Sequence, residues 1–202
     1  MPQGIRKHKT GESLPQFRSL ALIALGSNEP FDAFTVANTV NSAIDRLEYN
    51  LGVIRSKSRL FNTPAFPEGS GPDFVNAAVA VHTDLDAQQI IEGLHRIESE
   101  FGRARTQRWG QRTLDLDLIG MGDLVLPNQE AYQKWAGLPL EEQMRQAPDQ
   151  LILPHPRVQE RAFVLIPLMD VAADWIHPVS GLSVSQMVDA LPSKLRDEVK
   201  AL

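Results

Sequence analysis

The order of hydrophobic and polar residues predicts a strand and then a helix near the start of the chain. The short apolar run 19–25 is followed by a Gly-Ser-Asn turn at 26–28, which is typical of a buried strand that ends in a tight turn. Apolar residues at steps of three and four then predict a helix over 31–49, which Gly52 ends. The expected apolar face of this helix consists of Phe34, Ala37, Val40, Ile44 and Leu47.

Two more strands and a second helix are predicted next. Segments 53–61 and 74–82 have the composition of strands and are joined by a loop rich in proline and glycine. Asp86 followed by Gln89 resembles a capping box, and a helical apolar stripe continues from there to Gly102. The sequence therefore predicts a strand pair followed by a capped helix.

Strict alternation over 113–119 predicts a half-buried strand with leucines on one face and Asp115 and Asp117 on the other. The elements then follow the order strand, helix, strand, strand, helix, strand, which is the βαββαβ pattern of ferredoxin-like α+β folds. We expect one domain over 19–202, with a mainly antiparallel sheet flanked by helices.

Four segments lie outside this core pattern. Residues 1–18 hold basic side chains among Gly, Ser and Pro, without an apolar stretch, and are expected to form a flexible N-terminal tail. Segment 127–150 has mixed polarity, three prolines and a weak helical patch, and we interpret it as an insertion. Closing helices are predicted over 167–173 and 184–191.

Composition excludes several classes of protein. A chain without cysteine has no disulfides, thiolate metal sites or cysteine nucleophiles, and it fits a reducing compartment such as the cytoplasm. A net charge of −5 argues against nucleic acid or an acidic membrane as the partner. The sequence has no apolar run of about 18 residues, the length that a membrane helix needs. We expect a cytoplasmic monomer that binds neither nucleic acid nor membranes.

The strongest chemical signal is the pair Asp115 and Asp117. Two carboxylates two residues apart on a strand lie about 7 Å apart, since each residue advances ~3.3 Å. This spacing suits one or two hard cations, and oxygen ligands favour Mg²⁺ over Zn²⁺. An isolated Asp-x-Asp motif is more often a solvated strand face, so the pair needs support from its surroundings.

Four arginines in segment 103–112 supply that support in an otherwise acidic chain. Arginine binds phosphate oxygens through two parallel hydrogen bonds, so arginines beside cation-binding carboxylates are typical of a polyphosphate site. A solvated arginine-rich loop with surface ion pairs is the alternative. The sequence contains no P-loop, Rossmann or protein-kinase motif, which excludes those nucleotide-binding classes.

Four other residues have both a functional and a structural interpretation. His155 lies between two prolines, where it could contact phosphate, act as an acid or base, or be an ordinary loop histidine. Asn76 is polar within a predicted core strand and needs a partner, which is either a ligand or a neighbouring loop. Phe74 and Phe163 are core residues by default, although their rings can also stack on a flat heterocycle.

Five motifs in this order resemble the 6-hydroxymethyl-7,8-dihydropterin pyrophosphokinase family. They are IALGSN at 23–28, FNTP at 61–64, PDFVNAAV at 72–79, RWGQRTLDLDL at 108–118 and LPHPRVQERAFVLIPL at 153–168. The resemblance implies a ferredoxin-like enzyme that transfers pyrophosphate from ATP to the hydroxymethyl group of 6-hydroxymethyl-7,8-dihydropterin in folate biosynthesis. AMP would be released, and two Mg²⁺ ions would accompany ATP.

The resemblance also implies roles for single residues. The metal ligands would be Asp115 and Asp117, which with Arg103 and Arg112 would form the catalytic group. The nucleotide would be bound by Glu98, Arg108, Arg112, His155 and Arg161. The pterin would be bound by Thr63, Pro64, Phe66, Phe74, Asn76, Trp109 and Phe163.

The chain departs from the common family pattern at four positions. Phe74 and Pro156 stand where tyrosine is frequent, Thr106 where lysine is common, and Gln150 where some members carry arginine. The last three bear on the expected binding of ATP.

Two other functions remain as alternatives. A nucleotidyltransferase also combines a Gly-Ser turn with Asp-x-Asp, but in that class the two lie on adjacent elements, whereas here two predicted helices and two strands separate them. Pyrophosphate release from ATP would favour it, and AMP release would favour the pyrophosphokinase. An RNA-binding module built on the arginine segment would need more aromatic residues than Trp109 and conflicts with the negative net charge.

Overall fold

The computed structural model describes residues 19–65, 71–103 and 112–202. These residues form a six-stranded sheet in which β1 (Ser19–Ser27) is second from one edge. The antiparallel neighbours of β1 are β4 (Phe74–Thr83) and β5 (Asp115–Met121). The strand order is β5-β1-β4-β3-β6, and β2 also pairs with β4. The arrangement confirms the predicted ferredoxin-like α+β fold.

The predicted strand 53–61 is interrupted, and this part of the expectation was wrong. The structure has β2 (Val53–Lys57), paired with the second half of β4, and β3 (Phe61–Thr63), paired with the first half. Ser58 lies at the break. Its N–H donates to the Ala78 carbonyl at 2.9 Å, and its hydroxyl accepts the Ala78 N–H at 2.9 Å. A side chain thus replaces a backbone acceptor, and the regular ladder stops.

Helix α1 (Val36–Leu51) begins later than the predicted start at residue 31. Thr35 caps it, because its hydroxyl accepts the Asn38 N–H at 3.2 Å. Phe34, which we expected on the apolar face, precedes the helix and is 43% exposed. The three-residue spacing placed Phe34 in phase with the apolar stripe, but the cap starts the helix after it. Gly52 ends α1 as predicted.

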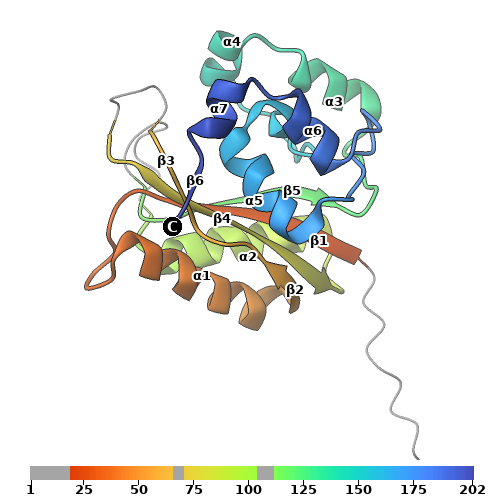
Figure 1. Ribbon diagram of the computed structural model, residues 1–202. Helices are drawn as coiled ribbons and strands as arrows, with labels where there is room; N and C mark the ends of the chain where they lie inside the picture. Colours follow the sequence, from red (N-terminus) through yellow and green to blue (C-terminus); the bar gives the residue numbers. More distant parts are fainter. Residues whose placement is uncertain (1–18, 66–70, 104–111) are drawn as a thin grey trace, which may run out of the picture.

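Helix α2 (Ala87–Glu100) confirms the predicted capping box. The Asp86 carboxylate accepts the Gln89 N–H at 2.8 Å, and the Gln89 side chain accepts the Asp86 N–H at 2.9 Å. Helices α1 and α2 cover one face of the sheet (Figure 1). The core on this face includes Ile23, Leu25, Val40, Leu47, Val79, Ile90, Leu94, Ile97, Leu116 and Leu118.

The opposite face is covered by the C-terminal helices (Figure 1). The main one, α5 (Ala162–Ala172), begins before the predicted start at residue 167, because the apolar run that precedes Pro167 belongs to the same helix. Helix α6 (Val184–Ala190) agrees with the prediction to within one residue, and α7 (Ser193–Asp197) leads into the short β6 (Lys200–Ala201). The core on this face includes Leu22, Ala24, Ala78, Ala80, Ile119, Val158, Leu165, Leu168 and Met187.

The segment interpreted as an insertion folds into α3 (Gln129–Ala136) and α4 (Leu140–Arg145), on the same side of the sheet as α5 and α6 (Figure 1). The weak helical patch corresponds to α4, whereas α3 was not predicted. Leu126 and Leu153 exchange backbone hydrogen bonds of 2.9 and 3.1 Å, which joins the two ends of the segment. In the described part of the chain, no helix is both long and apolar enough to span a bilayer.

Strand β5 begins and ends two residues later than the predicted strand 113–119, but its alternation is as predicted. Leu116 and Leu118 are buried in the core beside α1 and α2. Asp115 and Asp117 are partly exposed on the opposite side, which is the side of α5. The two carboxylates therefore share one face of the sheet.

Candidate active site

One row of residues runs across four strands, close to the ends of those strands. Asp115 on β5, Gly26 on β1, Asn76 on β4 and Phe61 on β3 lie directly opposite one another in register. Opposed residues of antiparallel strands project to the same face. Asp115 and Asn76 are two strands apart, which separates their backbones by about 10 Å at a strand spacing of ~4.8 Å. The carboxylate predicted for the cation and the amide predicted for the pterin therefore share a surface.

Small residues form the floor between these two groups. A Cβ atom on Gly26 would lie 2.9 Å from Asn76 Oδ1 and 3.7 Å from Phe74 Cδ1. In the next row, Asp117 lies opposite Ala24, which lies opposite Ala78. The sheet is thus flat between the acidic pair and the asparagine.

Asp115 is held by two of the predicted arginines. Its Oδ1 lies 2.7 Å from Arg103 Nη2, and its Oδ2 forms an ion pair with Arg112 Nη1. Burial raises the pKa of Asp115, and the nearby charge of Asp117 raises it further, while Arg112 and Arg103 oppose this shift. A cation near Asp115 and Asp117 would relieve the repulsion between them.

Glu98 lies beneath this group at the end of α2 and is 1% exposed. Its Oε1 forms an ion pair with Arg103 and accepts the Leu116 N–H at 2.9 Å. The structure thus places Glu98 at the junction of α2 and β5, where it holds Arg103 in position. Direct contact between Glu98 and the nucleotide stays a prediction.

His155 and Arg161 form a second group of N–H donors beside Asp117. Arg161 Nη1 lies 3.5 Å from Asp117 Oδ2 and 3.4 Å from His155 Nε2. Burial, and then the charge of Arg161, lower the pKa of His155 to about 3, so the ring is neutral at physiological pH. His155 Nδ1 accepts the Arg157 N–H at 3.1 Å, which leaves the ring hydrogen on Nε2. Two N–H donors thus lie side by side, an arrangement suited to one phosphate oxygen.

Residues predicted for the pterin gather at the other end of the row. Asn76 is 4% exposed, and its Nδ2 donates to Thr63 Oγ1 at 2.7 Å. The sequence left open whether a ligand or a loop is the partner of Asn76, and the structure shows a bond to the neighbouring strand β3. Phe74 lies opposite Thr63 on this face. Because Thr63 uses the amide nitrogen, Asn76 Oδ1 is turned toward Gly26.

Phe163 lies in the first turn of α5 and is 37% exposed. The Arg161 guanidinium carbon lies 5.7 Å from the centre of its ring, so the aromatic side chain adjoins the second group of donors. Pro64 follows β3 and is exposed. Phe66, Arg108 and Trp109 lie outside the described residues.

The structure adds Asn28, which the sequence pattern marked only as part of a turn. Its Oδ1 accepts the Arg112 N–H at 2.9 Å, its Nδ2 donates to the Pro72 carbonyl at 3.2 Å, and its own N–H donates to the Arg112 carbonyl at 3.1 Å. Asn28 thus joins the segment before β4 to the segment before β5. Its partners lie 44 and 84 residues away along the chain, so no local pattern reveals them.

The donor set of this face suits Mg²⁺ in particular. Among the described residues, no group of three or more His, Cys, Asp or Glu side chains is placed to hold a metal ion. Asp115 and Asp117 offer two carboxylates with phosphate-binding cations beside them. Mg²⁺ is commonly held by one or two carboxylates together with water and substrate phosphates, whereas Zn²⁺ needs a fuller set of protein ligands.

Sequence comparison identifies similar proteins over most of the chain. Residues 22–173 match the family described as 7,8-dihydro-6-hydroxymethylpterin-pyrophosphokinase (HPPK). A Synechocystis protein named 2-amino-4-hydroxy-6-hydroxymethyldihydropteridine pyrophosphokinase is 34% identical over 176 residues, which cover 87% of this chain and 77% of the relative. A Haemophilus influenzae protein of the same name is 33% identical over 162 residues, which cover 79% of this chain and 86% of the relative.

Structural comparison identifies similar folds. The crystal structure of wild-type Plasmodium falciparum HPPK-DHPS with SDX-DHP matches with a TM-score of 0.61 and 15% identity over 91% of this chain. A structure described as HPPK-DHPS in complex with substrates matches with a TM-score of 0.63 and 14% identity over 92% of this chain. The match spans 47% of each of those chains. At this identity the likeness shows a shared fold.

Proposed function

The chain belongs to the 7,8-dihydro-6-hydroxymethylpterin-pyrophosphokinase family, and we propose that the face around Asp115, Asp117 and Asn76 carries the reaction of that family. The enzyme transfers a pyrophosphoryl group from ATP to the hydroxymethyl oxygen of 6-hydroxymethyl-7,8-dihydropterin, a step of folate biosynthesis, and releases AMP. The observation that carries the proposal is the row from Asp115 through Gly26 to Asn76.

This row supports a division into two half-sites. At one end, the side chains of Arg103, Arg112 and Asp115 are suited to a polyphosphate with its cation. At the other end, Asn76 offers amide hydrogen-bonding atoms beside the Phe74 ring, which suits a flat heterocycle with donor and acceptor edges. The flat floor between them leaves room for the alcohol of one substrate to meet the phosphate of the other.

Mg²⁺ is the proposed cofactor, held by Asp115 and Asp117, with two ions expected alongside ATP. When bound, Mg²⁺ supplies positive charge to phosphate oxygens that become more negative during transfer. The remaining chemistry belongs to the chain. Arg161 and the Nε2–H of His155 would donate to a phosphate oxygen, and Arg103 and Arg112 lie close enough to Asp115 to reach the same phosphates.

In the proposed reaction, the pterin hydroxymethyl oxygen attacks the β-phosphorus of ATP. A bond forms from this oxygen to the β-phosphorus, and the bond from the β-phosphorus to the oxygen shared with the α-phosphate breaks, so that AMP leaves with that oxygen. The proton of the attacking hydroxyl is released to water. Charge develops on phosphate oxygens, which the arginines would stabilise. Alignment of the two substrates supplies the other large contribution, and no strong base is required.

Product analysis tests the function directly. The full chain with ATP, Mg²⁺ and 6-hydroxymethyl-7,8-dihydropterin should form AMP and the pyrophosphorylated pterin in equal amounts. A matched control with 6-methyl-7,8-dihydropterin, which lacks the attacking oxygen, should form neither product above background. Formation of ADP, or release of pyrophosphate from ATP, would contradict the proposed reaction.

A further inference from the structure

Segment 155–161 forms one hydrogen-bonded unit that carries both proposed phosphate donors, His155 and Arg161. The Val158 N–H donates to the His155 carbonyl at 3.1 Å, and the Arg161 N–H donates to the Val158 carbonyl at 3.2 Å. Between the two donors lies the short 3₁₀ helix η1 (Val158–Glu160). The position of η1 therefore helps to set the positions of both donors, together with the hydrogen bond from the His155 N–H to the Ile119 carbonyl of β5 at 2.8 Å.

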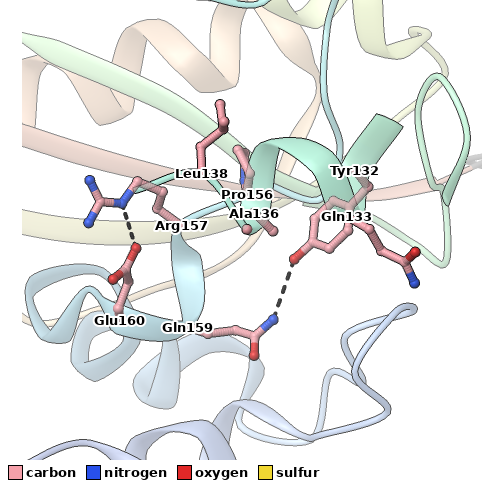
Figure 2. Close-up of a pocket in the computed structure, with 9 residues that line it drawn as sticks. Tyr132, Gln133, Ala136, Leu138, Pro156, Arg157, Gln159 and Glu160 are labelled. Atoms are coloured by element: carbon pink, nitrogen blue, oxygen red, sulfur yellow. Dashed lines mark hydrogen bonds and ion pairs between the residues drawn. The ribbon is translucent and has the colours of Figure 1, made fainter. Parts of the chain in front are cut away.

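Two neighbouring residues anchor η1 on opposite sides. Val158 is fully buried in the core beside α5. Gln159 is exposed, and its Nε2 donates to Tyr132 Oη of helix α3 at 3.4 Å (Figure 2). The contact of Val158 is apolar and therefore does not depend on direction. The contact of Gln159 is a directional hydrogen bond to the inserted segment.

Tyr132 is itself held firmly. It is 2% exposed, and its Oη lies 3.0 Å from Nε2 of His177, which is fully buried. His177 Nδ1 accepts the Val179 and Ser180 N–H groups, each at 3.2 Å, so the ring hydrogen is on Nε2 and is donated to Tyr132. The Tyr132 oxygen thus has a fixed position, and it accepts from both His177 and Gln159.

Helix α3 and η1 face each other across an open space. A cavity of about 500 Å³ lies between them, and its lining includes Tyr132, Gln133 and Gln159 (Figure 2). Arg157, which also lines it, pairs with Glu160 of η1. The hydrogen bond from Gln159 to Tyr132 therefore crosses a gap in the packing.

We propose that Tyr132 is a positioning residue for ATP, which holds η1 through Gln159 and so fixes the His155 and Arg161 donors beside Asp117. The inference rests on the proposed function. It gives the inserted segment 127–150 a role, as an outer support for the phosphate-binding segment. A single hydrogen bond between neutral groups makes only a modest net contribution to free energy, so its loss is expected to weaken ATP binding about fivefold.

Gln159→Met tests the proposal with little risk to the fold, because Gln159 is exposed. The variant keeps the length of the side chain while it removes the hydrogen-bond donor. We expect the KM for ATP and the calorimetric Kd of α,β-methylene-ATP to rise about fivefold, with kcat at saturating ATP and the Kd of the pterin unchanged. Tyr132→Phe should have the same effect on the nucleotide and also lower the melting temperature, because it removes the acceptor of buried His177.

The double variant Gln159→Met with Tyr132→Phe should bind the nucleotide no more weakly than whichever single variant has the lower affinity. Both substitutions remove the same hydrogen bond, so their effects should not add. Gln133→Ala, which lines the same cavity outside the hydrogen-bond chain, is the matched control and should bind ATP as the wild type does. Unchanged nucleotide affinity in Gln159→Met, or an equal loss of pterin and nucleotide affinity, would overturn the positioning role. Absence of pyrophosphorylated pterin with the wild type would instead overturn the proposed function.

Discussion

Gly26 lies directly opposite Asn76 in the sheet, so close that a Cβ atom on Gly26 would meet Asn76 Oδ1 at 2.9 Å. Real Cβ atoms do not approach other atoms so closely, so the asparagine must move when Gly26 carries a side chain. We therefore expect Gly26→Ala to weaken pterin binding about tenfold, roughly the contribution of one well-placed hydrogen bond in a buried site. Calorimetry with the pterin checks this. An unchanged pterin Kd in a folded Gly26→Ala protein would show that Asn76 Oδ1 does not contact the pterin.

Asn76→Ala should weaken pterin binding more than nucleotide binding, because the amide lies two strands away from Asp115. We expect a loss of about tenfold in pterin affinity and less than twofold for α,β-methylene-ATP. Thr63→Val is the companion variant, since it removes the acceptor of Asn76 Nδ2 and frees the amide to rotate. Equal losses for both ligands by calorimetry would assign Asn76 to structure alone.

Asp117→Ala should lower turnover by a factor on the order of 10² to 10³, as expected when a group that organises charge at a phosphate is removed. The fold should be retained, because Asp117 is partly exposed and its contact in the structure is the ion pair with Arg161. The rate of AMP formation at saturating Mg²⁺ measures the effect. Asp123→Ala, an exposed carboxylate just beyond the same strand, is the control and should keep full activity. Near-normal turnover of Asp117→Ala would exclude this residue as a metal ligand.

The stability of the protein should fall as the pH drops below about 6.5. Burial lowers the pKa of His177 from its ordinary value of 6.5, and burial lowers that of His155 to about 3. The unfolded chain therefore binds more protons than the folded one below pH 6.5, so protonation favours unfolding, and stability is complete only above that pH. Urea unfolding at pH 7.5, 6.5 and 5.5 measures the trend.

His177→Asn isolates one histidine in the same experiment. The raised pKa of Asp115 acts in the opposite sense, and the difference between the wild type and the variant removes that contribution. The variant should lose less stability between pH 7.5 and 5.5 than the wild type. Parallel curves for the two proteins would show that folding does not change the pKa of His177.

Short-range sequence patterns correctly predicted the face on which strand residues lie and the start of a capped helix. The alternation around Asp115 and Asp117 placed both carboxylates on one face, and the capping box at Asp86 marked the start of α2 correctly. The break at Ser58 was missed, because it depends on a hydrogen bond with Ala78, a residue of another strand. The same limit hid helix α3, whose single buried residue, Tyr132, gives no apolar stripe.

The site was predicted as a set of residue types, and its geometry was not. Nothing in the sequence around Gly26 reveals that β1 lies between the strands of Asp115 and Asn76, because strand order is set by the packing of the whole domain. The contacts of Asn28 and of His177 likewise join segments far apart in the chain. Family resemblance supplied the expected role of each residue, while the structure supplies the strand order and the contacts that bring these residues together.

The position of β1 between β5 and β4 also bears on which alcohols the enzyme would accept. Hydrogen bonds along both edges of β1 keep the two half-sites at a set distance of about 10 Å, so neither can slide toward the other. On the proposed function, this span fixes the distance between the bound pterin ring and the bound phosphates. Selectivity for the length of the arm between the ring and the attacking oxygen would then follow from the backbone.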